Sequence, residues 1–204
     1  MPDKLSEQLE RILNNRRERH TLRKLKINNL VDFSSNDYLG LAHSKELNQT
    51  IQSHSLNGLG STGSRLLSGH SQESVELEQF LAKFHKAPDA LLFNSGFDAN
   101  YGVFSCLPQP GDAIFYDELI HASVHAGMRA SQSKIIKPFI HNNIDSLLVL
   151  INNYKNIHSG NIFIAVESLY SMDGCWSNLK EIVELVEKFE NAFLIIDEVI
   201  PNSY

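Results

Sequence analysis

Residues 192–198 read AFLIIDE, and residues 165–174 read AVESLYSMDG. Each stretch is an apolar run that ends in acidic and small polar residues. Such a run is typical of a buried parallel strand, whose carboxyl end opens into the crevice where α/β proteins bind ligands. We therefore expect Glu167, Ser171 and Asp197 to face one common site.

The chain from residue 90 onward alternates short apolar runs with segments of helical periodicity. Helices are predicted wherever apolar residues recur at i, i+3, i+4 and i+7. Between them the sequence predicts five strands, at residues 90–93, 112–116, 134–139, 161–166 and 193–196. This alternation predicts an α/β fold with a parallel sheet covered by helices on both faces.

Upstream of residue 90 the signals are more local. Residues 4–26 are predicted to form one basic, amphipathic helix, and Ser71 is predicted to cap a second helix. The stretch between them, residues 57–69, is rich in glycine. Its glycines permit the close backbone approach of a phosphate-binding loop, but the composition favours a flexible connector.

The composition restricts the classes of function. With 204 residues and a net charge of −6, the chain has the composition of a soluble globular protein and is unsuited to general nucleic-acid binding. No run approaches the ~20 apolar residues of a membrane span, and the N-terminus lacks the apolar core of a secretory signal. We expect a cytoplasmic protein, and the sequence leaves a mitochondrial or peroxisomal location open if the source is a eukaryote. Two cysteines and nine histidines show no metal-binding spacing, so no metal site is predicted.

Two further positions lie just after predicted strands. Residues 94–100 lead from a strand through Ser95 and Gly96 into a helix, where free N–H groups and the helix dipole favour an anion. An ordinary turn between strand and helix explains the same pattern. His121 also follows a strand and could face the crevice, although a lone histidine is more often a capping or packing residue.

Taken together, these segments resemble the α-oxoamine synthases, pyridoxal-phosphate enzymes with the aspartate-aminotransferase fold (fold type I). They most resemble the branch that makes 8-amino-7-oxononanoate. Six matching segments occur in the family's order: residues 33–41 (FSSNDYLGL), 60–69 (GSTGSRLLSG), 94–100 (NSGFDAN), 121–123 (HAS), 167–174 (ESLYSMDG) and 196–198 (IDE).

The resemblance implies a role for each cofactor-site residue. Backbone N–H groups of Gly96 and Phe97 would bind the cofactor phosphate, and His121 would stack on the pyridine ring, touch the substrate and take part in catalysis. Asp197 would pair with the pyridine nitrogen. Ser171 would hydrogen-bond the cofactor, and Glu167 would shape the same strand end.

The resemblance also implies a reaction. In a homodimeric enzyme, Arg23 would bind substrate and Asn36 would lie beside the amino-acid substrate. The enzyme would condense that amino acid, with L-alanine favoured, with an acyl-CoA, with pimeloyl-CoA favoured. Aminoketone, CoA and CO₂ would be the products, as in biotin biosynthesis.

The sequence departs from the family after residue 198. Ile200 stands where the family has a histidine, and the family's Schiff-base lysine aligns beyond residue 204. Two later strands of the family's sheet and its small C-terminal domain also align beyond that point. We therefore expect a truncated chain, inactive alone, with an N-terminal arm over residues 1–43 and part of the cofactor-binding large domain over residues 44–204.

Two other functions are considered. A lysine-less, non-catalytic subunit of a heteromeric oxoamine synthase, similar to serine palmitoyltransferase, fits the missing histidine, although such a partner is expected to keep a complete sheet. A doubly wound nucleotide-binding module unrelated to pyridoxal phosphate rests on the strand–helix alternation alone.

Overall fold

The computed structural model describes residues 3–27, 30–53 and 60–198, and the chain divides into two compact units, residues 1–55 and 56–204. The domain boundary predicted after residue 43 lies within the first unit and stays a prediction. Residues 57–59 of the glycine-rich stretch and the family difference at Ile200 lie outside the described residues.

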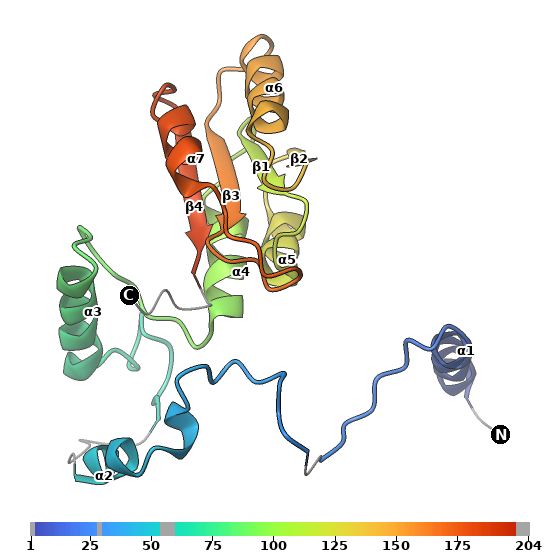
Figure 1. Ribbon diagram of the computed structural model, residues 1–204, viewed down its shortest axis with the longest axis vertical. Coiled ribbons are helices and arrows are strands. Elements are labelled where there is room, and N and C mark those ends of the chain that lie inside the picture. Colours follow the sequence, from blue (N-terminus) through green and yellow to red (C-terminus); the bar gives the residue numbers. More distant parts are fainter. Residues whose placement is uncertain (1–2, 28–29, 54–59, 199–204) are drawn as a thin grey trace. The chain divides into compact units, whose positions relative to one another are not determined.

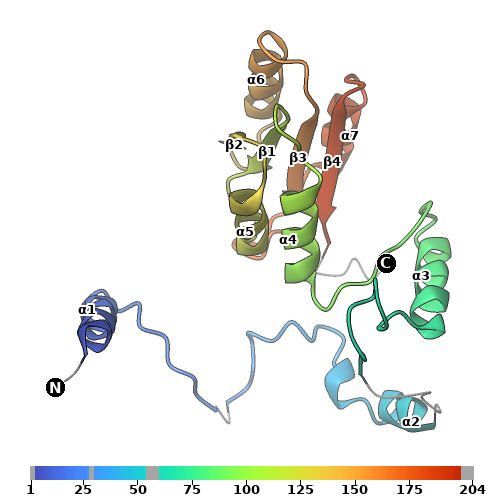
Figure 2. The same cartoon turned by 180° about the vertical axis from the view of Figure 1, so that it is seen from behind.

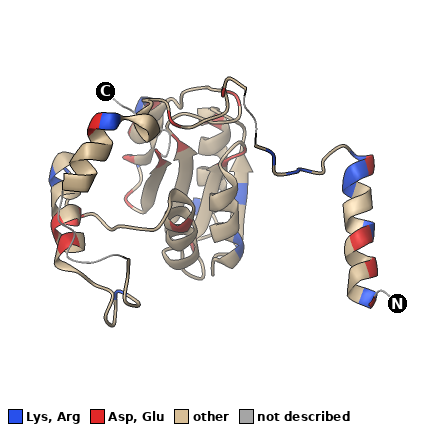
Figure 3. Ribbon diagram, turned by 90° about the horizontal axis from the view of Figure 1, so that it is seen from below, with Lys and Arg blue, Asp and Glu red and all other residues tan. Residues whose placement is uncertain are grey.

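The first unit is built from short helices. It contains α1 (Lys4–Glu18), a 3₁₀ turn at Leu41–His43 and α2 (Lys45–Ser53). Figure 3 shows that α1 carries charges of both signs along its length.

The prediction of one helix over residues 4–26 is wrong beyond Glu18. His20 adopts a left-handed backbone conformation with φ 55°, and its N–H donates to the Arg17 carbonyl at 3.1 Å. The Thr21 N–H donates to the Arg16 carbonyl at 2.9 Å. This pair of bonds satisfies the last carbonyls of the helix and turns the chain away from the helix axis.

The second unit contains a parallel sheet of four strands in the order β2-β1-β3-β4 (Figure 1). The strands are β1 (Ala113–Asp117), β2 (Ile135–Phe139), β3 (Ile162–Glu167) and β4 (Ala192–Asp197). The α/β prediction and four of the five predicted strands are therefore confirmed. In this sheet β4 is an edge strand.

Helices cover both faces of this sheet. Figure 1 shows α6 and α7 on the near face, and Figure 2, from behind, shows α4 and α5 on the other. The helices of the second unit are α3 (Gln72–Phe84), α4 (Gly96–Cys106), α5 (Ala122–Ala130), α6 (Ile144–Lys155) and α7 (Leu179–Val186).

Alternate residues of each strand enter two separate hydrophobic clusters. Ile162, Ile164 and Val166 of β3 pack with α6 and α7, whereas Phe163 and Ala165 pack with α4 and α5. This alternation follows from the two-residue period of a strand. The face on which a strand-end side chain lies is thus set by its place in the sequence.

The strand predicted at residues 90–93 is wrong, because these residues form no strand in the structure. The Leu92 N–H donates to the Glu78 carboxylate at 2.7 Å instead of to a neighbouring strand. A strand needs an adjacent strand for its backbone bonds, and an apolar run alone does not supply one. Leu91 and Phe93 are accordingly exposed.

The cap predicted at Ser71 is confirmed, since its side chain accepts a hydrogen bond from the Ser74 N–H. Ser95 caps α4 in the same way by accepting from the Asp98 N–H at 3.1 Å. Among the described residues, no helix combines the length and apolar character needed to cross a membrane.

Candidate functional site

Two acidic side chains meet where β3 and β4 end. Glu167 and Asp197 are the last residues of these strands and are direct partners in the register. Both continue the alternation that places Ala165 and Ile195 in the cluster under α4 and α5. The structure therefore brings these two predicted residues together on one face of the sheet.

A chain of hydrogen bonds connects Asp197 to His121. The Asn100 side-chain amide in α4 donates to Asp197 Oδ2 at 2.6 Å and to Ser123 Oγ at 3.0 Å. Ser123 Oγ lies 2.7 Å from His121 Nδ1. Ser123 is fully buried, so this chain is a fixed connection between β4, α4 and the start of α5.

These contacts define the tautomer of His121. The Ser123 backbone N–H donates to His121 Nδ1 at 3.2 Å, so Nδ1 acts as an acceptor. Because the Asn100 amide already donates to Ser123 Oγ, the serine hydroxyl is left to donate to the same ring nitrogen. The neutral ring then carries its proton on Nε2. His121 itself is the N-cap of α5 and is exposed.

Glu167 lies in an environment that disfavours its charge. Burial raises the pKa of the Glu167 carboxyl, and the Asp197 carboxylate raises it further, whereas the backbone N–H groups of Ser171 and His121 lower it. The side chain is only 5% exposed, and its Oε1 has no hydrogen-bond partner within the described structure. A buried oxygen without a hydrogen-bond partner is unfavourable, so a donor placed beside it would be stabilising.

The N-terminus of α4 supplies donors to the same region. Gly96 and Phe97 are the first two residues of the helix, where backbone N–H groups lack intrahelical acceptors. Asn100 lies four residues further on, about 6 Å along the helix axis. The bond from Asn100 to Asp197 therefore fixes this helix end about one turn from the acidic strand end. Asp98, exposed in the same first turn, is the one acidic residue there.

Other predicted residues are not part of this arrangement. Ser171 is exposed in the turn after β3, and only its backbone N–H acts on Glu167. Arg23 and Asn36 lie in the first unit and are exposed, so their proposed contact with a substrate stays a prediction.

The described part of the glycine-rich loop folds on itself. Thr62 Oγ1 donates to the Ser68 carbonyl at 2.8 Å, and the Arg65 guanidinium holds Glu78 of α3 through two bonds of 2.7 and 2.8 Å. Because this bidentate pair favours the carboxylate, it lowers the pKa of Glu78 to about 2. The loop is thus anchored to α3.

Asn100 and Ser123 are site residues for which the sequence analysis proposed no role. Each ends a segment that carries the family resemblance, at residues 94–100 and 121–123. The available signal was that each of these two polar residues stands at the end of a segment that matches the family. The packing of α4 and α5 decides which side chains these two residues connect, and local sequence does not predict that packing.

Comparison with known proteins matches this geometry to a family. The family model described as "Aminotransferase class I and II" matches residues 28–199. An 8-amino-7-oxononanoate synthase of Emericella nidulans is 45% identical over 97% of this chain and 52% of its own length. The chain spans about half the length of the curated relatives it matches.

Solved structures with a similar fold come from the same group of enzymes. An 8-amino-7-oxononanoate synthase from Francisella tularensis has a TM-score of 0.61 and 28% identity, covering 81% of this chain and 44% of its own. A structure of SPT with PLP has the same TM-score and identity over 73% of this chain and 36% of its own. The fold is therefore that of the PLP enzymes of fold type I.

Proposed function

This chain belongs to the class I and II aminotransferase family, and from that premise we propose that the whole protein is a pyridoxal-phosphate-dependent acyltransferase. The proposed reaction condenses an amino acid, with L-alanine favoured, with an acyl-CoA, with pimeloyl-CoA favoured. It yields an aminoketone, CoA and CO₂, as in biotin biosynthesis. The relative of 45% identity, an 8-amino-7-oxononanoate synthase, supports this choice among sister reactions.

The observation that carries the proposal is the bond from Asn100 to Asp197 at 2.6 Å. It holds an acidic strand end about one helical turn from the donor end of α4. A pyridoxal phosphate molecule has a basic ring nitrogen at one side and a phosphate arm at the other. The residues present fit both ends of such a molecule, and the unpartnered Glu167 Oε1 marks the same region as a place that lacks a donor.

Each residue has a defined task in this proposal. When bound, the cofactor supplies an electron sink for negative charge developing on the amino acid. Asp197 would accept a hydrogen bond from the protonated pyridine nitrogen, and Asn100 would orient the Asp197 carboxylate. The N–H groups of Gly96 and Phe97 bind the phosphate, where the helix dipole also favours negative charge.

His121 and the residues after β3 complete the proposed site. With Nδ1 engaged by Ser123, the ring of His121 is held in one orientation and presents Nε2–H outward for stacking and for contact with substrate. Glu167 supports the strand end, and Ser171 lies in the turn that follows it. In the proposed homodimer, Arg23 binds substrate and Asn36 lies beside the amino acid.

We do not assign the Schiff-base lysine to any residue of this chain. Lys180 is in α7, and Lys188 lies two residues past its end. That helix packs on the sheet face opposite Asp197, through Ile182, Leu185 and Val186. Residues 1–204 alone are therefore proposed to be inactive.

The test uses two proteins. One is the 204-residue chain, and the other continues residues 1–198 with the remaining part of the Emericella nidulans relative. Release of CoA from L-alanine and pimeloyl-CoA is measured with a thiol reagent. We expect release by the hybrid and none by the shorter chain. A hybrid that turns over only glycine or serine with another acyl-CoA would reject the proposed substrates, and release by the shorter chain would reject its inactivity.

A further inference from the structure

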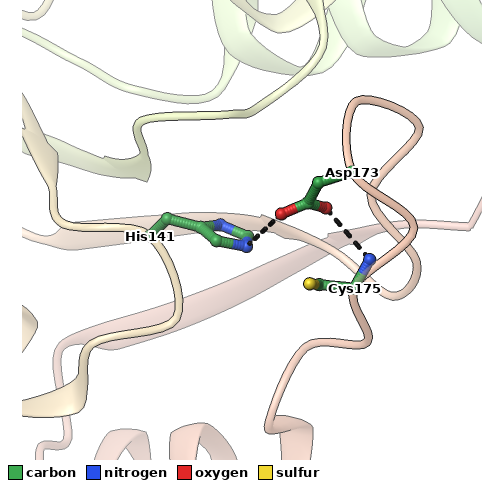
Figure 4. A group of neighbouring side chains, drawn as sticks. All are labelled: His141, Asp173 and Cys175. Atoms are coloured by element: carbon green, nitrogen blue, oxygen red, sulfur yellow. Dashed lines mark hydrogen bonds and ion pairs between the residues drawn. The ribbon is translucent and has the colours of Figure 1, made fainter.

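A second group of side chains lies at the same end of the sheet, on the opposite face. Within the described residues, one group of histidine, cysteine and acidic side chains has metal-binding proximity: His141, Asp173 and Cys175, with ligand atoms within 4.8 Å of one another (Figure 4). His141 follows β2, and the other two lie in the loop after β3. The proposed acyltransferase reaction uses none of the three.

His141 is held as a metal-binding histidine is usually held. Its Nδ1 donates to Asp117 Oδ1 at 2.8 Å, and the Asp117 side chain is almost completely buried. Asp117 also accepts backbone N–H groups from Leu119 and Asn142, so the carboxylate cannot turn away. A carboxylate on one ring nitrogen fixes the tautomer and directs the lone pair of the other nitrogen outward.

That lone pair faces another acceptor. His141 Nε2 lies 3.3 Å from Asp173 Oδ2. The side-chain nitrogen of Asn142 lies 3.2 Å from the same ring nitrogen. A metal ion between the two atoms would bind to both, because a ring nitrogen with a free lone pair and a carboxylate oxygen are both zinc ligands.

The spacing matches a tetrahedral zinc site. With zinc–nitrogen and zinc–oxygen bonds of about 2.0–2.1 Å, two ligands of a tetrahedron lie about 3.3 Å apart. This is the separation of His141 Nε2 and Asp173 Oδ2. A zinc-bound sulfur would lie about 3.6 Å from the nitrogen. The exposed Cys175 thiol therefore needs a shift on the order of 1 Å, which a rotation of its side chain supplies.

We propose that His141 Nε2, the Asp173 carboxylate and Cys175 Sγ bind one zinc ion, with the fourth position open to water. One nitrogen, one oxygen and one sulfur donor suit zinc better than magnesium or calcium. On binding, the thiol releases its proton to solvent and a zinc–sulfur bond forms. Asn142 gives up its contact with Nε2 and keeps its bond to the Trp176 carbonyl.

The other chemistry considered for this group is a cysteine nucleophile. A nucleophilic cysteine needs a lowered pKa. Here the Asp173 carboxylate and burial raise the pKa of Cys175. The zinc proposal therefore rests on the positions of the three ligand atoms, which lie within 4.8 Å of one another.

The test adds cobalt(II) to the metal-free, full 204-residue chain. Cobalt occupies zinc sites and gives a thiolate-to-metal charge-transfer band, which only sulfur ligation produces. The one tryptophan, Trp176, is next to Cys175 in sequence, so its fluorescence is expected to be quenched as the band appears. Zinc is expected to displace cobalt and remove the band, whereas magnesium is expected to leave the band unchanged.

Matched variants separate the site from other thiols. Cys175→Ser is expected to abolish the band, and Asp173→Asn to weaken cobalt binding by at least about tenfold. Cys106→Ser, which removes the other exposed free cysteine, should leave band and affinity unchanged. Both ligand changes are at exposed side chains, and circular dichroism of the same samples checks the fold. No band in the parent chain, or a band lost in Cys106→Ser and kept in Cys175→Ser, would overturn the proposal.

Discussion

Two neighbouring strands, β1 and β3, end in buried carboxylates that have opposite surroundings. Asp117 of β1 is completely buried, and three donors satisfy it: the His141 ring and the N–H groups of Leu119 and Asn142. Glu167 of β3 is also buried, but one of its oxygens lacks a partner within the described structure. The Asp117 carboxylate has hydrogen-bond donors for both oxygens, whereas the Glu167 carboxyl can still accept a hydrogen bond at Oε1.

The two carboxylates also lie on opposite faces of the sheet. Asp117 continues the alternation of Ala113 and Phe115 toward α6 and α7, and Glu167 that of Phe163 and Ala165 toward α4 and α5. A saturated buried charge stabilises local structure, whereas an incompletely satisfied one lowers stability and marks a place for a ligand. This difference separates the anchor of the proposed zinc site from the proposed cofactor site.

The strongest test of the comparison is Asp117→Ala. It leaves three partly buried donors without their acceptor, so we expect the free energy of unfolding to fall by about 3–5 kcal/mol. Urea titration followed by circular dichroism measures this. Asp117→Asn, which keeps the shape and one acceptor oxygen, should cost less, about 1–3 kcal/mol. Equal, small losses for both variants would mean that Asp117 is not an anchor.

Ser123→Ala breaks the connection on the other face. It removes the hydroxyl between Asn100 and His121 in a fully buried position, and we expect a loss of about 1–3 kcal/mol in the same titration. Ser159→Ala, at an exposed position before β3, is the matched control and should change stability by less than about 0.5 kcal/mol. Similar effects from the two changes would contradict the proposed network.

Glu167→Gln should act in the opposite direction. The folded state raises the pKa of Glu167 above its ordinary value of 4.5, so its ionised form is a cost to folding at neutral pH. We expect the variant to be more stable by about 1 kcal/mol near pH 7. As the pH falls through the folded pKa toward 4.5, the parent chain protonates and the difference shrinks. A variant that is less stable at neutral pH would show that Glu167 is saturated after all.

Glu78 offers a third carboxylate, away from the sheet, and the smallest effect. The Arg65 guanidinium lowers its pKa to about 2, so its contribution to stability is present above 4.5 and is lost as the pH falls toward about 2. Carboxyl carbon NMR should place its titration near that value. In Arg65→Gln we expect it to move back toward 4.5. No movement would show that the pair does not hold the loop to α3.

Local sequence foretold most of the fold because strands and helices have short periods. It failed where the deciding partner was distant. Residues 90–93 are apolar enough for a strand but have no neighbouring strand, and Leu92 bonds to Glu78. The first helix ends early because His20 takes a left-handed conformation that apolar periodicity does not register.

The site shows the same limit. Glu167 and Asp197 could be placed together because the ends of parallel strands meet at one edge. The roles of Asn100 and Ser123 could not be foreseen, since their bonds depend on how two helices pack. Metal-ligand spacing rules read short intervals on one element, and His141 and Asp173 come from two loops. The sequence analysis therefore predicted no metal site at the position where we propose one.

The pairing of Glu167 with Asp197 in the register of β3 and β4 has a consequence for tolerance to insertion and deletion. One residue added or removed inside β4 would turn Asp197 to the opposite face, because side chains alternate along a strand. The same change in the turn after α7 would alter only the length of a connection. The proposed cofactor site therefore depends on the number of residues in β4. Lengthening that strand by a single residue would move the Asp197 side chain to the other face of the sheet, away from α4.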